Sequence, residues 1–96
     1  MTKIRKRIRF YGAVQGVGFR YRSCYAAERA GVTGWVRNES DGSVSMEIQG
    51  TEEQIDHVIA ALDSSMYIHI RKMDVKTLPV DEDEREFYVK EDWWYY

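Results

Sequence analysis

The sequence predicts an α+β domain in the order strand, helix, strand, strand, helix, strand, with a short extra strand near the C-terminal end. Three observations predict it. Apolar and polar residues alternate in several short segments, small or apolar residues recur at helical spacing in two longer segments, and Asp41-Gly42 forms a tight-turn signal between two alternating segments. These two periods separate the expected strands from the expected helices.

The first expected strand covers residues 4–14. Its alternate positions are apolar or small on one side and mostly cationic on the other: Ile4, Ile8, Phe10 and Gly12 against Arg5, Arg7, Arg9 and Tyr11. We therefore expect one face on the core and the arginine face in water. A row of arginines could also bind nucleic acid. However, 14 Lys and Arg against 16 Asp and Glu give a net charge of -2, which argues against that role.

Residues 19–30 are expected to form the first helix, because small side chains recur along one stripe: Phe19, Ser23, Ala26, Ala27 and Ala30. Gly31 is the type of residue that commonly ends a helix. Small residues along the stripe predict close packing on the sheet.

The residues after Gly31 are typical of a β-hairpin. In residues 32–38, Val32, Gly34 and Val36 alternate with Thr33, Trp35 and Arg37. The turn at Asp41-Gly42 leads into a third strand, where Val44, Met46 and Ile48 alternate with polar residues.

The second helix has the clearest sequence pattern. Thr51 and Gln54 match a capping box, and apolar residues follow at positions i, i+3, i+4 and i+7: Ile55, Val58, Ile59 and Leu62. After this helix we expect a fourth strand at 68–78, a solvated acidic loop at 81–84 and a short last strand at 87–90. The connection at 64–69 lacks glycine and proline, which leaves its path open.

This order matches the split βαβ, or ferredoxin-like, arrangement, in which two helices cover one face of a mostly antiparallel sheet. A right-handed first crossover makes the first two strands parallel, so the loop at 14–19 and Asn38 should be neighbours. Residues 1–96 are expected to form a single domain, since domains usually hold about 100 to 150 residues, with 91–96 as an aromatic C-terminal extension.

The loop at 14–20 joins the first strand to the first helix and favours an anion. Gly16 and Gly18 allow a turn whose N–H groups point inward near a helix N-terminus. Arg20 in the first helical turn opposes the helix dipole, at a cost of about 0.3 to 1 kcal/mol unless an anion compensates, and its guanidinium can grip phosphate at two points. We expect inorganic phosphate or sulfate to bind there. A glycine turn beside a surface arginine would account equally well for these residues alone.

Other ligand motifs are absent from the sequence. Gly16 and Gly18 lack the third glycine of a dinucleotide fingerprint, and no Gly-Lys-Ser/Thr follows as in a P-loop, so no ATP, NAD or other cofactor is expected. The lone Cys24 excludes an internal disulfide, and His57 and His69 lie far from it in sequence, so no metal site is expected. We interpret Cys24 as an inert packing thiol.

Two blocks of the sequence together resemble the acylphosphatase family. The segment from Val14 to Arg20 resembles the signature loop of that family, and the segments 31–38 and 41–44, with Gly50, resemble its second block at the family's spacing. The resemblance implies that the loop from Gln15 to Arg20 binds the substrate phosphate, that Arg20 is the essential anchor, and that Asn38 orients the attacking water. Backbone N–H groups would act at Gly16, Val17, Gly18 and Phe19. The bound phosphate would accept the water's proton, without metal or covalent intermediate.

The physical properties of Asn38 are compatible with this role. Period two places Asn38 on the same side as Val36, towards the helix whose first turn holds Arg20. An amide can orient water but cannot act as a general base. An acyl phosphate has a carboxylate leaving group that needs no protonation, so positioning and charge stabilisation can suffice. A hairpin-end residue with turn propensity is the simpler alternative for Asn38.

A binding module of the same fold is the competing function. Such a module would present aromatic residues from its middle strands to RNA or dock another protein, but the third strand alternates aliphatic residues with Ser43, Ser45, Glu47 and Gln49. A regulatory domain that keeps only the fold is a third possibility, which the pair Arg20 and Asn38 argues against. The four aromatics at 93–96 could cover the open sheet face, stack on a ligand or dock a second protomer, and we expect the first.

The expected partner is a small-molecule acyl phosphate; acetyl, carbamoyl and glyceroyl phosphates remain equally open. No nucleic acid partner is expected. No apolar run approaches the roughly 20 residues that span a membrane, and no apolar segment follows the charged residues 1–7 as in a secretory signal. We therefore expect a cytoplasmic protein. We also expect it to be a monomer.

Overall fold

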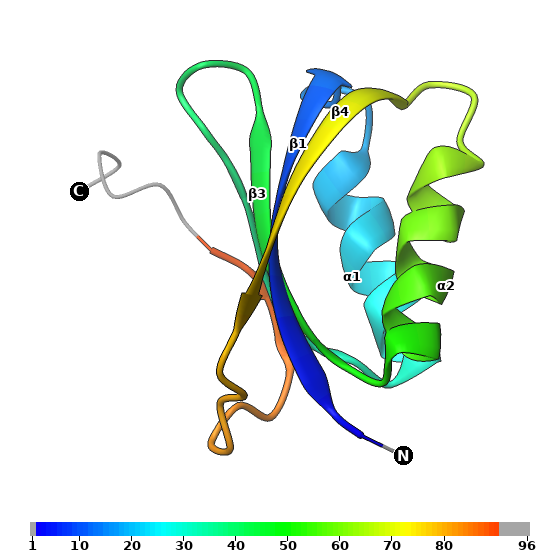
Figure 1. The fold of residues 1–96 in the computed structure, drawn as a ribbon. Helices are drawn as coiled ribbons and strands as arrows, with labels where there is room; N and C mark the ends of the chain where they lie inside the picture. The colour runs from blue at the N-terminus through cyan, green and yellow to red at the C-terminus, as the bar shows by residue number, and fades with distance from the viewer. Residues whose placement is uncertain (1, 91–96) are drawn as a thin grey trace.

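Two helices cover one face of a five-stranded sheet in the computed structural model of the chain, and no helix within residues 2–90 lies on the other face (Figure 1). The structure describes residues 2–90. The elements are β1 (Ile4–Ala13), α1 (Phe19–Ala30), β2 (Thr33–Asn38), β3 (Val44–Gly50), α2 (Glu52–Asp63), β4 (His69–Leu78) and β5 (Phe87–Val89). The predicted ferredoxin-like order is confirmed, including the short extra strand.

The order of strands across the sheet is β4-β1-β3-β2-β5. Strands β1 and β2 are both antiparallel to β3, so they run in the same direction, as the crossover rule predicts. Phe10 of β1 and Asn38 of β2 both lie opposite Val44 of β3. The last residue of β2 is therefore level with the final part of β1. The C-terminal ends of both strands lie at the same end of the sheet.

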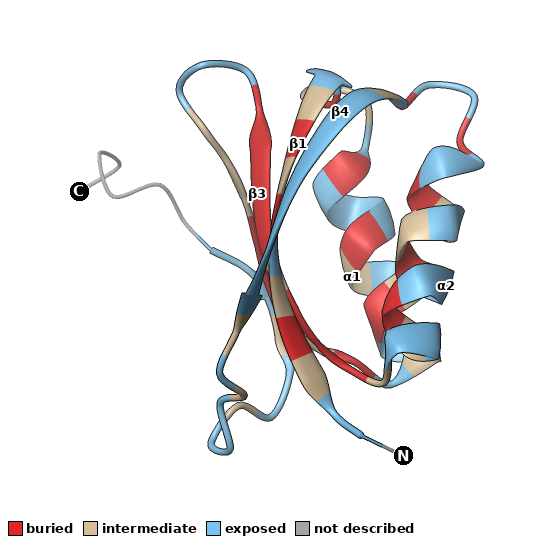
Figure 2. Cartoon of the chain, viewed as in Figure 1, coloured by how far each residue is buried: buried red, intermediate tan, exposed pale blue. Residues whose placement is uncertain are grey.

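The core lies between the helices and the sheet (Figure 2). Alternate strand residues and one stripe of each helix are buried in it, the largest being Phe10, Phe19, Ile8, Met46, Ile48, Ile55 and Leu62. The rings of Phe10 and Phe19 meet edge to face with their centroids 4.9 Å apart. Because Phe19 is the first residue of α1, this contact fixes the start of the helix above the end of β1.

Helix α2 begins with the predicted capping box. The backbone N–H of Gln54 donates to Thr51 Oγ1 at 3.1 Å, and the Gln54 side-chain oxygen accepts from the Thr51 N–H at 2.9 Å. Two of the N–H groups that a helix start leaves without an acceptor are therefore satisfied.

Thr51→Ala is expected to destabilise the protein by about 1 kcal/mol, because it removes one half of this box. For a domain of this size the loss lowers Tm by about 4 to 8 °C. Thermal unfolding followed by circular dichroism measures the shift. Thr51→Ser keeps the hydroxyl and serves as the control. An alanine variant that melts with the wild type would show that the cap contributes nothing to stability.

Part of the expected solvated face is buried, which corrects the prediction for Arg5 and for Glu84, whereas residues 81–83 of the acidic loop are exposed as predicted. Arg5 is only 5% exposed and forms ion pairs with Glu47 at 2.9 Å and Glu84 at 2.8 Å. Burial opposes the charge, but the hydrogen bonds and charges of Glu84 and Glu47 outweigh it and raise the pKa of Arg5. The cause is the path of the β4–β5 connection, which returns across the open face and brings Glu84 to Arg5.

Trp35 also lies on the open face of the sheet and is only 6% exposed. The cations of Arg7, Arg37 and Lys90 lie over its ring at 6.0, 5.4 and 4.5 Å from the centroid. Long cationic side chains thus cover this aromatic ring in place of a second layer. The aromatic segment 91–96, which we expected to cover this face, lies outside the described residues.

Candidate active site

The segment between β1 and α1 turns on two glycines in the left-handed region. Gly16 has φ 74° and Gly18 has φ 81°. A Cβ at either position would meet no atom within 4 Å, so the backbone conformation, and not crowding, calls for glycine here. Gly18 is the N-cap of α1 and supplies no side-chain hydrogen bond to it. The first N–H groups of α1 therefore have neither an intrahelical acceptor nor a capping side chain, which leaves them available to an anion.

Gln15 ties this segment to the β2–β3 hairpin. Its side-chain Nε2 donates to the carbonyl oxygens of Glu39 at 2.7 Å and Ser43 at 2.9 Å. These two contacts engage both amide N–H groups, so the Gln15 side chain fixes the loop against the hairpin. Asn38 precedes Glu39 directly, and the bridge therefore sets the distance between the loop and Asn38. Sequence reasoning did not find this contact, because it depends on how the hairpin turns.

The hairpin is itself closed by Asp41. Its carboxylate accepts hydrogen bonds from the side chain and the backbone N–H of Ser43, and it pairs with Arg9 at 3.0 Å. These contacts, led by the Ser43 hydroxyl, lower the pKa of Asp41 to about 2. A carboxyl group whose pKa is lowered by folding contributes stability above its unfolded pKa and loses it as the pH falls. The stability that the ionised Asp41 carboxylate gives to the turn is therefore lost only as the pH falls from about 4 towards 2.

A cavity of about 370 Å³ opens where the loop, the start of α1 and the end of β2 meet. It is lined by Val14, Gly16, Gly18, Phe19, Arg20, Tyr21, Cys24, Asn38 and Val89. The structure thus brings Arg20 and Asn38 to one cavity, as the parallel direction of β1 and β2 predicts. Of the expected loop residues, Gln15 and Val17 do not line it: Gln15 bonds to the hairpin, and half-buried Val17 packs against the core.

Arg20 presents its charge freely at this cavity. Its side chain is exposed, and none of the ion pairs among residues 2–90 includes it. By contrast, Arg5, Arg9 and Arg37 are all matched with carboxylates. A cation in the first turn of α1 is unfavourable without a counterion. The position of Arg20 therefore suits a site whose anion is supplied by a ligand.

Neither Glu39 nor Cys24 is suited to acid–base or nucleophilic chemistry here. Glu39 follows Asn38, but Arg37 holds its carboxylate at 3.2 Å. Burial works against this charge, yet hydrogen bonds from Ser45 and Arg37 outweigh it and lower the pKa of Glu39. Burial raises the pKa of the Cys24 thiol, which favours the unreactive protonated form. This supports the interpretation of Cys24 as a packing residue.

Four cavity residues were not predicted as site residues from the sequence: Val14, Tyr21, Cys24 and Val89. Val14 adjoins the predicted loop, and Cys24 was interpreted as a packing residue. Val89 reaches the site because β5 pairs in parallel with β2 and places Val89 beside Val36. Tyr21 lies at the rim and is 78% exposed. The hairpin pattern could not reveal which strand β5 joins, and an exposed tyrosine one residue after Arg20 carries no motif of its own.

Two further features concern metals and membranes. Within residues 2–90, no three His, Cys, Asp or Glu side chains are grouped so that they could hold a metal ion. Neither helix in the described part of the chain is long and apolar enough to span a bilayer.

Comparison with known proteins gives consistent matches. Residues 6–89 match the family model described as Acylphosphatase. The acylphosphatase of Oceanobacillus iheyensis is 41% identical over 81 residues, which cover 82% of this chain and 89% of that protein. The acylphosphatase of Thermoplasma volcanium is 40% identical over 86 residues, covering 88% and 94%. The crystal structure of the acylphosphatase from Bacillus subtilis superposes with a TM-score of 0.82 at 29% identity, over 92% of this chain and 99% of that chain.

Proposed function

The chain belongs to the acylphosphatase family, and from this premise we propose that it hydrolyses the carboxyl–phosphate bond of small acyl phosphates. The products are a carboxylate and inorganic phosphate, and the enzyme is a hydrolase acting on acid anhydrides. The observation that carries the proposed site is the single cavity shared by the exposed Arg20 guanidinium, the start of α1 and Asn38.

The phosphate group is proposed to bind in the loop from Gln15 to Arg20. Free N–H groups at the start of α1 and the positive end of the helix dipole favour an anion at this point. The Arg20 guanidinium adds two parallel donors, which match two phosphate oxygens. Gly16 and Gly18 permit the turn and carry no side chain that would fill the space beside it. Inorganic phosphate should occupy the same cradle.

The attacking water is proposed to be held by the Asn38 side chain, which shares the cavity with Arg20. Water attacks phosphorus in line with the bond to the carboxylate. The phosphate itself accepts the water's proton, so neither Glu39 nor Cys24 is required as a base. The bond from phosphorus to the acyl oxygen breaks, and its electron pair leaves with the carboxylate. Arg20 and the loop amides stabilise the charge that develops on the phosphoryl oxygens.

Hydrolysis is expected to proceed without added metal, because the loop amides and Arg20 supply the positive field that a divalent ion would otherwise provide. Purified protein should hydrolyse benzoyl phosphate and acetyl phosphate at the same rate with and without a chelator such as EDTA. Release of inorganic phosphate measures the rate, and uncatalysed hydrolysis in the same buffer is the control. Loss of activity in the chelator would overturn the metal-free mechanism, and no turnover above the buffer rate would favour a binding module.

The remaining expectations concern assembly and location. We propose that the enzyme works as a monomer. The cytoplasmic location stays a prediction.

A further inference from the structure

A second cavity adjoins the active site and is not used by the proposed reaction. Its volume is about 490 Å³, and it is lined by Val17, Gly18, Tyr21, Arg22, Tyr25, Ser65 and Tyr67. It shares Gly18 and Tyr21 with the catalytic cavity. A ligand held by the phosphate loop could therefore extend from one cavity into the other without leaving the protein surface.

The two cavities lie on different sides of the phosphate loop. Strand β1 has β3 and then β2 on one side and β4 on the other. Asn38 ends β2, whereas Ser65 and Tyr67 belong to the connection that leads into β4. In Figure 1 the β2–β3 hairpin and the α2–β4 connection stand on opposite sides of the start of α1. Asn38 therefore lines the catalytic cavity from one side, and Tyr67 lines the second cavity from the other.

This arrangement determines which way the acyl group of a bound substrate points. In an in-line displacement the attacking water and the leaving group occupy opposite sides of the phosphorus. If the water lies on the side of Asn38, the acyl group points away from β2, towards the α2–β4 connection. The second cavity is the hollow that receives it there, because its wall includes Gly18 of the phosphate loop.

The walls of the second cavity have an aromatic character. Tyr21, Tyr25 and Tyr67 are 78%, 56% and 68% exposed. Large rings gathered around one hollow and left in water commonly mark a binding site. The Tyr67 N–H donates to the Ser65 hydroxyl at 3.2 Å, and Ser65 is only 8% exposed. This contact holds the short connection that presents Tyr67, although the connection contains neither glycine nor proline.

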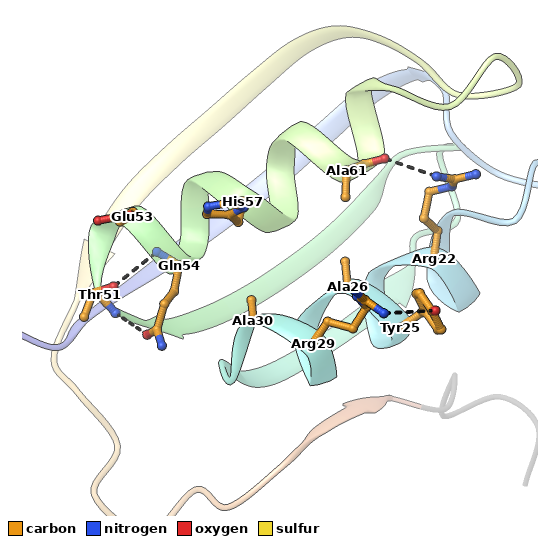
Figure 3. A pocket seen from close by; sticks show the side chains of 10 residues that line it. All are labelled: Arg22, Tyr25, Ala26, Arg29, Ala30, Thr51, Glu53, Gln54, His57 and Ala61. Carbon is orange, nitrogen blue, oxygen red and sulfur yellow. Dashed lines mark hydrogen bonds between the residues drawn. The ribbon is translucent and has the colours of Figure 1, made fainter.

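The opposite wall of the cavity is also held in place. Figure 3 shows Arg22 and Tyr25 where α1 faces α2. Arg22 reaches the carbonyl oxygen of Ala61 at 3.4 Å, and Arg29 donates to the Tyr25 hydroxyl at 3.4 Å with its charge over the ring. The larger groove drawn there, of about 710 Å³, contains no residue of the catalytic cavity.

We infer that the second cavity binds the acyl group of the substrate and favours an apolar, aromatic acyl group over a small one such as acetyl. This inference rests on the proposed function, because it assumes that an acyl phosphate occupies the loop. Tyr25 and Tyr67 are the residues that set the preference. Both line only the second cavity and would contact only the acyl group of the substrate, whereas Tyr21 lines both cavities and would affect phosphate binding as well.

The test compares benzoyl phosphate with acetyl phosphate. Benzoate and acetate leave with similar ease, so the ratio of the two kcat/KM values reports binding of the acyl group. Tyr67→Ala and Tyr25→Ala should each lower this ratio about twofold to tenfold, mainly through KM for benzoyl phosphate, as expected for loss of one aromatic contact. Tyr67→Phe keeps the ring and should keep the ratio. Tyr88→Ala is the matched control, because Tyr88 is a 41% exposed tyrosine of β5 that lines neither cavity.

A second readout does not depend on turnover. Calorimetry with the stable analogues benzoylphosphonate and acetylphosphonate should show the same preference in the wild type and the same loss in the two alanine variants. Unchanged ratios in both variants would overturn the acyl site while leaving hydrolysis intact. An equal change in Tyr88→Ala would overturn it too, by showing a non-specific effect. Absence of hydrolysis in the wild type would instead overturn the proposed function, whatever the analogues do.

Discussion

Arg20→Lys is expected to lose most of the activity, by roughly a hundredfold or more in kcat/KM, although the positive charge is kept. The guanidinium of Arg20 is exposed at the catalytic cavity and is free of ion pairs within the described residues. An ammonium group cannot reproduce a planar grip on two phosphate oxygens. Because the grip serves both the bound substrate and the transition state, binding should weaken along with turnover.

The measurement is steady-state hydrolysis of benzoyl phosphate, with inhibition by inorganic phosphate as a second readout of the cradle. Arg71→Lys is the matched control, because Arg71 is an exposed arginine of β4 that lines neither cavity. The control should behave as the wild type in both assays. A lysine variant at position 20 with normal activity and normal inhibition would mean that the phosphate anchor is another residue.

Asn38→Ala is expected to separate turnover from phosphate binding. Removing the amide deprives the water of its position while the loop and Arg20 stay in place, so kcat should fall by roughly a hundredfold or more, about 2.7 kcal/mol. Inorganic phosphate should still inhibit with nearly unchanged affinity, because the cradle does not include the Asn38 side chain. The loop should keep its place, because the Gln15 bridge to the hairpin uses the carbonyls of Glu39 and Ser43.

Two outcomes would contradict this assignment. A folded Asn38→Ala variant with normal turnover would reduce Asn38 to a hairpin residue, and equal loss of phosphate inhibition would make it part of the cradle. Thermal unfolding checks that the variant is folded. Ser40→Ala is the matched control, since Ser40 is an exposed residue of the same hairpin and does not line the catalytic cavity.

The elements whose signals are local could be predicted from the sequence. The capping box at Thr51 and Gln54, the glycine at the end of α1 and the turn at Asp41-Gly42 each act within a few residues, and each is where the pattern predicts it. The meeting of the phosphate loop with Asn38 could also be predicted, because it follows from the direction of two strands and not from side-chain detail.

What could not be predicted depends on the path of connections between distant strands. The buried pair of Arg5 and Glu84 joins residues at opposite ends of the sequence through the loop before β5. Alternation marks Arg5 as outward-facing but gives no information about a loop that covers that face. The same limit applies to Val89 and to Tyr67, which reach their cavities only through the order of the strands.

Strand β3 supplies none of the residues that line the catalytic cavity, yet it aligns β1, which leads into the phosphate loop, with β2, which ends at Asn38. Phe10 and Asn38 share the single partner Val44, so the relative height of the loop and of Asn38 is set only when β3 has paired with both β1 and β2. These pairings join residues far apart in the chain and carry a large loop-closure cost during folding. A chain without the paired sheet would lack the alignment that brings Asn38, and the water it is proposed to orient, to the phosphate loop. On refolding, turnover therefore returns only when β3 has paired with both β1 and β2.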